Sequence, residues 1–175
     1  DQPPVMIKLF DLAGRKAVVT GASRGIGKTV IKALRANGAF CYGLSNEAIE
    51  SDDPASSIVN VSSINYRLGI AGRAIYSTSK AGILGLTTGL ARELGRQSIR
   101  INTVSPGWVF TERQIQEYFE APDADCHLNT LAERQSLPIK IHPLDVANHI
   151  LFYLSEVSRT STGHNCVVDG GWLLE

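Results

Sequence analysis

Tyr76 and Lys80, four positions apart, are a candidate acid–base pair. In a helix this spacing places both side chains on one face. A lysine ammonium beside a phenol favours the phenolate, so such a tyrosine can donate and accept protons. The alternative interpretation is an ordinary helical tyrosine–lysine pair with no such role.

A serine thirteen residues before the tyrosine could belong to the same site. Ser63 follows a short apolar segment, residues 57–61, which we expect to be a strand. In open α/β sheets, ligands bind at the carboxyl ends of the strands, where Ser63 would lie. A strand-end hydroxyl that satisfies a backbone group is the alternative. No histidine and acidic partner suits a nucleophilic serine, so we reject a hydrolase.

A glycine-rich segment is the second candidate site. Residues 20–27 read TGASRGIG, between a predicted strand over 16–20 and a helix that begins at Gly25. Glycines at such a turn let a ligand approach the backbone, and the amides and dipole of a helix N-terminus favour a phosphate. The spacing is G-x-x-x-G-x-G, not the G-x-G-x-x-G of the usual dinucleotide fingerprint. A turn that binds no ligand is the alternative.

The predicted secondary structure around these residues alternates between strands and helices. Short apolar segments predict strands, and apolar residues that recur at helical spacing predict helices. The expected strands cover residues 16–20, 39–44, 57–61, 100–104 and 166–168, and the expected helices begin at Gly25, Tyr76 and Pro143. This order predicts an α/β fold with a doubly wound, Rossmann-like parallel sheet in a single domain, residues 1–175.

Three segments carry further expectations. Residues 1–10 are expected to form an N-terminal tail, and the polar residues 112–141 an irregular substrate lid with a short helix. The helix over 76–95 should carry one apolar stripe, and glycines beside that stripe suggest the close approach of another backbone or helix. The stripe consists of Ile83, Leu86, Leu90 and Leu94, and the glycines are Gly82, Gly85 and Gly89.

The composition narrows the class of protein. The 175 residues are 43% hydrophobic and 19% charged, which excludes a disordered chain, a collagen and a coiled coil. Basic and acidic residues balance at 17 each, so nucleic-acid binding is disfavoured. No apolar run approaches the roughly 20 residues of a membrane span. Three cysteines without a paired motif disfavour a disulfide framework or a metal site. We expect a cytoplasmic protein that binds no metal.

Taken together, the motifs resemble the short-chain dehydrogenase/reductase family. The matching pieces occur in family order and are TGASRGIG (20–27), VNVSS (59–63), YSTSK (76–80), IRINTVSPGWVFT (99–111) and VVDGG (167–171). The resemblance implies an oxidoreductase that moves a hydride between nicotinamide and a carbonyl or secondary alcohol. Tyr76 would be the acid/base, Lys80 would assist it and bind the nicotinamide ribose, and Ser63 would hydrogen-bond the substrate oxygen.

The resemblance also implies a dinucleotide site. Besides Tyr76 and Lys80, the residues implied to line it are Gly21, Ser23, Arg24, Gly25, Ile26 and Gly27 in the turn, and Pro106, Gly107, Val109 and Thr111 at the nicotinamide end. An acidic residue after the second strand would favour NAD, but this sequence has Ser45 and Asn46 there. We therefore expect NADP, with NAD as the alternative.

The substrate implied by the resemblance is a sugar or polyol. The segment from Trp108 to Gln114, with residues 162–164 and 171–172, looks like members that act on such substrates. Arg113 and Gln114 would bind hydroxyl groups, although a solvated helix start is an equal interpretation. A 3-oxoacyl reductase of fatty-acid synthesis and a catalytically inactive nucleotide-binding or scaffold form are the alternatives. Family members usually assemble through the helix that carries the tyrosine, so we expect a homodimer or homotetramer.

One part of the family pattern has no counterpart in this sequence. Only 55 positions separate Gly21 from Tyr76, and roughly 80 residues that the pattern has between Asn46 and about Ser57 are absent. They would include a strand between the first and third strands. Direct pairing of those two strands would shift the site by about 4.8 Å, too much for hydride transfer. We therefore expect the whole protein to contain a further segment at this point.

Overall fold

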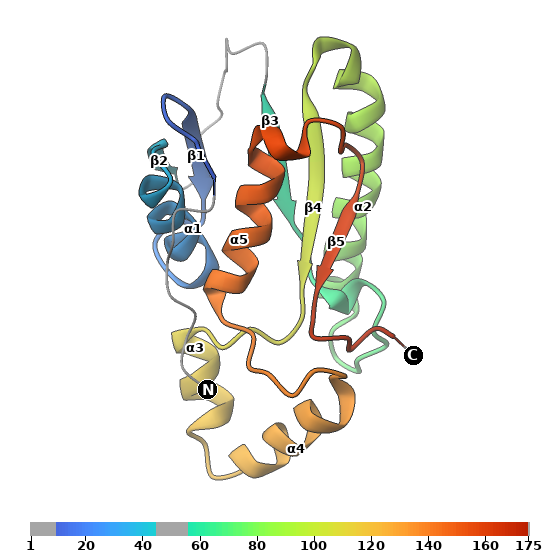
Figure 1. The fold of residues 1–175 in the computed structure, drawn as a ribbon. Helices are drawn as coiled ribbons and strands as arrows, with labels where there is room; N and C mark the ends of the chain where they lie inside the picture. The colour runs from blue at the N-terminus through green and yellow to red at the C-terminus, as the bar shows by residue number, and fades with distance from the viewer. Residues whose placement is uncertain (1–9, 45–55, 175) are drawn as a thin grey trace.

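The computed structural model describes residues 10–44 and 56–174, and its first part is a βαβ unit. The strands β1 (Lys16–Thr20) and β2 (Phe40–Leu44) pair in parallel, and the helix α1 (Gly25–Ala36) connects them (Figure 1). The helix buries Val30, Ala33 and Leu34 and ends at Asn37, whose buried side-chain amide donates to the carbonyl of Ala33. This order of elements is the one that the sequence predicts.

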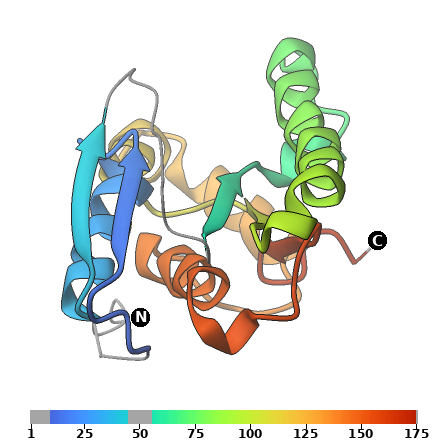
Figure 2. The same ribbon diagram turned by 90° about the horizontal axis from the view of Figure 1, so that it is seen from above.

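A second parallel sheet contains three strands in the order β3 (Ser57–Val61), β4 (Arg100–Pro106) and β5 (Asn165–Val168). The helix α2 (Ala74–Leu94) covers one face, and α5 (Pro143–Leu154) packs on the other face and against α1 (Figure 2). Pro143 occupies the first turn of α5, as expected, and the backbone N–H of His142 donates to the Asp145 carboxylate there. Helices on both faces of parallel strands confirm the α/β class.

Within residues 10–44 and 56–174, the strands form two sheets instead of one. β1 pairs only with β2, and β3 pairs only with β4, so the first and third strands are not joined directly. The central residues of β1 are consequently half-buried, although their apolar sequence is typical of a strand covered on both sides. The tail residues 1–9 and most of the segment from Asn46 to Ser57, where the family pattern has further residues, lie outside the described residues.

The helix α2 buries its apolar stripe only in part, because Ile83, Leu90 and Leu94 are half-buried and Leu86 is exposed. Its two buried residues are Thr87 and Ala91, and Thr87 shares a short hydrogen bond with Thr103 of β4. Leu86 is 55% exposed and Ile75 is 90% exposed. The glycines at 82, 85 and 89 have no neighbour within 4 Å of an added Cβ among the described residues. The close packing expected at these glycines is therefore not made within this part of the chain.

The segment over residues 112–141 is more ordered than the irregular lid that we expected. It contains α3 (Glu112–Gln114), a π-helical turn (Ile115–Phe119) and α4 (Ala124–Arg134). Aromatic packing explains the difference, because the Trp108 ring contacts the rings of Tyr118, Phe119 and His127. None of the described helices is long and apolar enough to cross a membrane.

Candidate active site

Tyr76 and Lys80 share one face in the first two turns of α2, as their spacing predicts. The Lys80 Nζ lies 5.6 Å from the centroid of the Tyr76 ring. The same ammonium donates to the carbonyl of Val61 at 3.2 Å, which ties the start of α2 to the end of β3. The hydroxyl of Ser62 donates to the Lys80 carbonyl at 2.8 Å from the same strand end. Tyr76 itself is 42% exposed, so a ligand can reach its phenol.

Ser63 lies two residues beyond β3, at the strand end where the sequence places it. It begins a short 3-10 turn, residues Ile64–Tyr66, and is almost fully buried. Its Oγ accepts hydrogen bonds from the backbone N–H of Asn65 at 3.3 Å and from the Asn65 side-chain amide at 3.4 Å. Asn65 is not among the site residues expected from the sequence, although a serine whose oxygen accepts from the N–H two residues later is a known turn motif.

The glycine turn has the backbone geometry that a phosphate site needs. Gly21 and Gly25 have positive φ angles of 65° and 55°, which side-chain-bearing residues rarely adopt. A Cβ at Gly27 would lie 2.3 Å from the carbonyl oxygen of Gly21, so only glycine fits there. The N-cap of α1, Arg24, makes no side-chain capping bond, and Ser23 and Arg24 are exposed. The first amides of α1, at Gly25, Ile26 and Gly27, therefore suit the phosphates of a dinucleotide.

The segment over residues 106–111 lies against both the glycine turn and β5. A Cβ at Gly25 would lie 3.6 Å from the Thr111 methyl group, so the turn and this segment adjoin. A Cβ at Gly107 would lie 2.8 Å from the Asp169 Cα, which explains the glycine after Pro106. Thr111 caps α3 by accepting from the Gln114 N–H, and Val109 is buried. The glycine turn and the nicotinamide-end segment expected from the sequence are thus neighbours.

Arg113 and Gln114 in the lid have different surroundings from each other. The Arg113 guanidinium pairs with Glu117 at 3.0 Å and is 68% exposed, which fits the interpretation of a solvated helix start. The Gln114 side-chain oxygen accepts a bond of 2.6 Å from the indole N–H of Trp108. Trp108 is the centre of an aromatic cluster, which we call the lid cluster, formed by Trp108, Tyr118, Phe119, His127 and Trp172.

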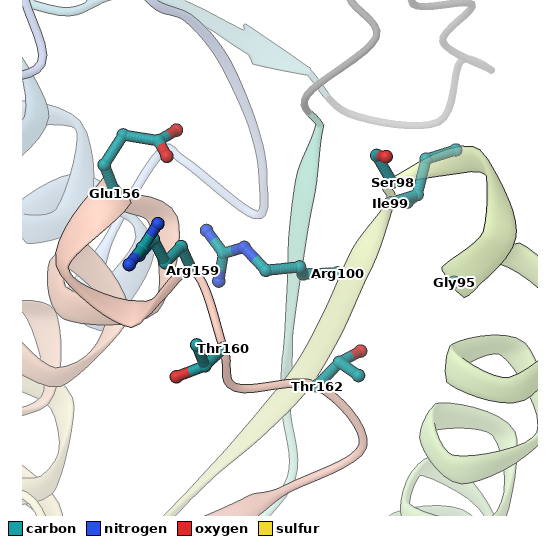
Figure 3. Close-up of a pocket in the computed structure, with 8 residues that line it drawn as sticks. All are labelled: Gly95, Ser98, Ile99, Arg100, Glu156, Arg159, Thr160 and Thr162. Atoms are coloured by element: carbon teal, nitrogen blue, oxygen red, sulfur yellow. The ribbon is translucent and has the colours of Figure 1, made fainter.

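A cavity of about 380 Å³ lies at the amino end of β4, away from these residues (Figure 3). Its wall includes Arg100, whose guanidinium donates to the carbonyls of Tyr153 and Ser155 at the end of α5. Burial lowers the pKa of Arg100, and the ring of carbonyl acceptors explains why an arginine is held there. The cavity contains none of the predicted site residues, and this arginine is a structural cap for α5. Among the described residues, no cluster of histidine, cysteine and acidic side chains could hold a metal.

The sequence of this chain is similar to those of several known proteins. A family model described as enoyl-(acyl carrier protein) reductase matches residues 40–173. The chain is 39% identical over 115 residues to D-xylose 1-dehydrogenase of Caulobacter vibrioides, a match that covers 66% of this chain and 44% of that protein. It is 36% identical over 128 residues to (3R)-3-hydroxyacyl-CoA dehydrogenase of Mus musculus, covering 71% of this chain and 46% of that protein. These matches span less than half the length of either relative.

The fold of this chain is also similar to that of a solved structure. The structure of 4-hydroxyisoleucine dehydrogenase complexed with NADH superposes with a TM-score of 0.81 at 22% identity. That match covers 93% of this chain and 100% of the other. At this identity the likeness concerns the fold, and it agrees with the α/β architecture described above.

Proposed function

The chain belongs to the short-chain dehydrogenase/reductase family, and we propose that the whole protein transfers a hydride between a nicotinamide dinucleotide and a carbonyl or secondary alcohol. The observation that carries this proposal is that the Lys80 ammonium lies over the Tyr76 ring and also bonds the Val61 carbonyl at the end of β3, two residues before Ser63. The relatives that the chain matches are named as dehydrogenases.

In the proposed reaction the chain's own residues handle the proton. When the substrate is an alcohol, its O–H proton passes to the Tyr76 oxygen while the carbon–hydrogen bond breaks, and in the reverse direction Tyr76 returns the proton to a carbonyl oxygen. Lys80, whose ammonium lies 5.6 Å from the centroid of the Tyr76 ring, assists this proton transfer and binds the nicotinamide ribose in the proposed complex. Ser63 donates a hydrogen bond to the substrate oxygen. The bound nicotinamide supplies or accepts the hydride.

The proposed cofactor site extends from the glycine turn to residues 106–111. The amides of Gly25, Ile26 and Gly27 would hold the phosphates, and the exposed Arg24 would lie near the adenosine ribose. A cation at that position favours a 2′-phosphate, so we propose NADP as the preferred cofactor and NAD as the alternative. Ser45 and Asn46, on which this preference also rests, lie outside the described residues.

The proposed substrate is a sugar or polyol. The likeness to a D-xylose dehydrogenase supports this choice, and so do the aromatic rings of the lid cluster, which can pack on the apolar face of a sugar ring. The match to the enoyl-(acyl carrier protein) reductase model and to a hydroxyacyl-CoA dehydrogenase favours the alternative, a 3-oxoacyl reductase. A catalytically inactive nucleotide-binding or scaffold form is the third possibility.

A substrate panel tests these proposals. The purified protein would be mixed with NADP or NAD and each of a set of aldoses and polyols, and in the reverse direction with reduced cofactor and 3-oxoacyl thioesters. Turnover on an aldose or polyol supports the first proposal, and turnover confined to the thioesters supports the alternative. Cofactor binding without turnover on any carbonyl or alcohol would support the inactive form.

We further propose that the protein is a cytoplasmic homodimer or homotetramer that contacts its partner through α2. Leu86, Ile75 and the three uncovered glycines give α2 an exposed face of small and apolar residues, which suits contact with another helix. Nucleic acid and membrane are not proposed as partners.

A further inference from the structure

We propose that Asn65 is a positioning residue that directs the hydroxyl proton of Ser63 toward the substrate oxygen, an inference that rests on the function proposed above. Two hydrogen bonds from Asn65 to Ser63 suggest this role. Both the backbone N–H and the side-chain amide of Asn65 donate to the same oxygen, Ser63 Oγ, at 3.3 Å and 3.4 Å.

The number of hydrogen bonds that a hydroxyl group can make limits what Ser63 can do once both contacts are formed. A serine hydroxyl has one proton to donate and two lone pairs with which to accept. The two donors of Asn65 occupy both lone pairs, and no acceptor for the Ser63 proton is found in residues 10–44 and 56–174. The remaining hydrogen-bonding capacity of Ser63 is therefore a single donor. A substrate carbonyl or alkoxide oxygen, which gains negative charge during the reaction, is the acceptor that such a donor stabilises.

The turn that carries Asn65 is anchored on both sides of this residue. Ile64 is buried in the interior. The Tyr66 hydroxyl accepts a bond of 3.3 Å from the side-chain amide of Asn165 in β5, and Ser105 of β4 donates to the Asn165 oxygen at 2.6 Å. These contacts fix the turn to two strands of the second sheet. The Asn65 amide consequently has little freedom to turn away from Ser63.

A second feature of Asn65 argues against a merely structural role. Its side-chain oxygen is buried and has no hydrogen-bond partner among the described residues. Leaving a buried carbonyl oxygen without a donor lowers stability. The backbone N–H of residue 65 would by itself satisfy Ser63 as the cap of the turn, so the structure of the turn does not require the side-chain amide. The amide is accounted for if its contribution is the second bond to Ser63.

Exchange of the amide for a carboxylate tests the inference. In Asn65→Asp the side chain accepts instead of donating, so it would capture the Ser63 proton. We expect kcat to fall about 10²-fold with little change in KM, comparable to the loss of one donor to a developing oxyanion. In Asn65→Ala, which keeps the backbone N–H, kcat should fall only about tenfold. Asn148→Asp, on α5, adds the same charge where no site residue lies and serves as the matched control.

The decisive comparison places both Asn65 substitutions in a Ser63→Ala background. If Asn65 acts through Ser63, the two changes are not additive, and Asn65→Asp or Asn65→Ala lowers kcat no further once the hydroxyl is gone. Cofactor titration by tryptophan fluorescence should be unchanged in every variant, and thermal unfolding measures separately the change in stability at the partly buried position 65. The inference would be overturned, with the proposed function left standing, if the losses in kcat multiplied in the double variants. Full activity in both Asn65 single variants would overturn it in the same way. A wild-type protein that turns over no substrate would overturn the proposed function, and this inference with it.

Discussion

Gly25 and Thr111 lie against each other although 86 positions separate them: a methyl group at Gly25 would lie 3.6 Å from the Thr111 Cγ2. This contact joins the glycine turn of the βαβ unit to the segment that follows β4 in the second sheet. Residues that the sequence suggests for the phosphate end and for the nicotinamide end of one cofactor are thereby brought side by side, even though the two sheets share no strand pairing among the described residues.

Replacing Gly27 with alanine should disrupt the glycine turn. The new Cβ would lie 2.3 Å from the Gly21 carbonyl oxygen, so the turn must shift. We expect cofactor affinity to fall at least tenfold and the free energy of unfolding to fall by about 1–3 kcal/mol. Cofactor titration and urea unfolding would measure the two effects. Gly95→Ala is the matched control, because Gly95 has helical angles and open space around an added Cβ. Equal affinity in both variants would speak against a ligand at this turn.

Replacing Leu86 with arginine should weaken the proposed assembly. Leu86 is exposed on α2, and a charge in the centre of an apolar helix contact would have to be buried without a partner. Light scattering after size-exclusion chromatography should therefore show a smaller species for this variant. Val157→Arg, at an exposed apolar residue outside α2, should leave the assembly unchanged. A monomeric wild-type protein would rule out the proposed dimer or tetramer.

The three cysteines should differ in reactivity. Burial raises the pKa of the Cys166 thiol, an effect that its hydrogen bond with Tyr153 opposes only in part, and burial also raises the pKa of Cys41. Because the thiolate is the nucleophile, an alkylating reagent should modify the exposed Cys126 first and Cys166 only slowly. Mass spectrometry of alkylated peptides would detect the order of modification, and equal rates would contradict it.

The raised pKa values also mean that the folded state holds the thiol protons more tightly than the unfolded state does. The free energy of unfolding should thus decline as the pH rises past 9.0, the ordinary pKa of a thiol.

The mass of the intact protein tests the expected additional segment. Because 115 residues make up 44% of the D-xylose dehydrogenase, that relative is about 260 residues long. A protein with about 80 further residues would have a mass of about 27–28 kDa at this chain's mean residue mass. Intact mass spectrometry of the protein isolated from its cells should give that value. A mass of 18.9 kDa would instead mean a true deletion, and the enzyme proposal would then give way to the inactive form.

Much of the fold could be predicted because local sequence decides it. The strands over 16–20 and 57–61 and the helix from Gly25 have the predicted bounds, since short apolar segments and helical periodicity are local signals. The face that α2 buries could not be predicted in this way. Its buried residues are Thr87, which bonds Thr103 of β4, and Ala91, and which face is buried depends on the neighbours that the helix meets.

The candidate site shows the same division. The spacing of Tyr76 and Lys80 sufficed to place them together, because one helix carries both. The bond of Lys80 to Val61 and the contact between Gly25 and Thr111 join separate elements, so no local pattern contains them. The sequence predicts one short helix in the lid, whereas the folded segment contains two helices and a π-helical turn, and the reason is related. Aromatic residues spread from Trp108 to Trp172 stabilise that segment, and they meet only in the folded chain.

The rate of hydride transfer in a Tyr76→Phe variant shows whether the Tyr76 oxygen carries the proton. With the substrate that the panel identifies, reduced nicotinamide would be followed for the wild-type protein and for the variant, with cofactor affinity measured separately. Removal of the phenolic oxygen should lower kcat by about 10²–10⁴-fold, the range for loss of a general acid–base group, and leave cofactor affinity within about twofold. A Tyr76→Phe variant that turns over as fast as the wild-type protein would contradict the account.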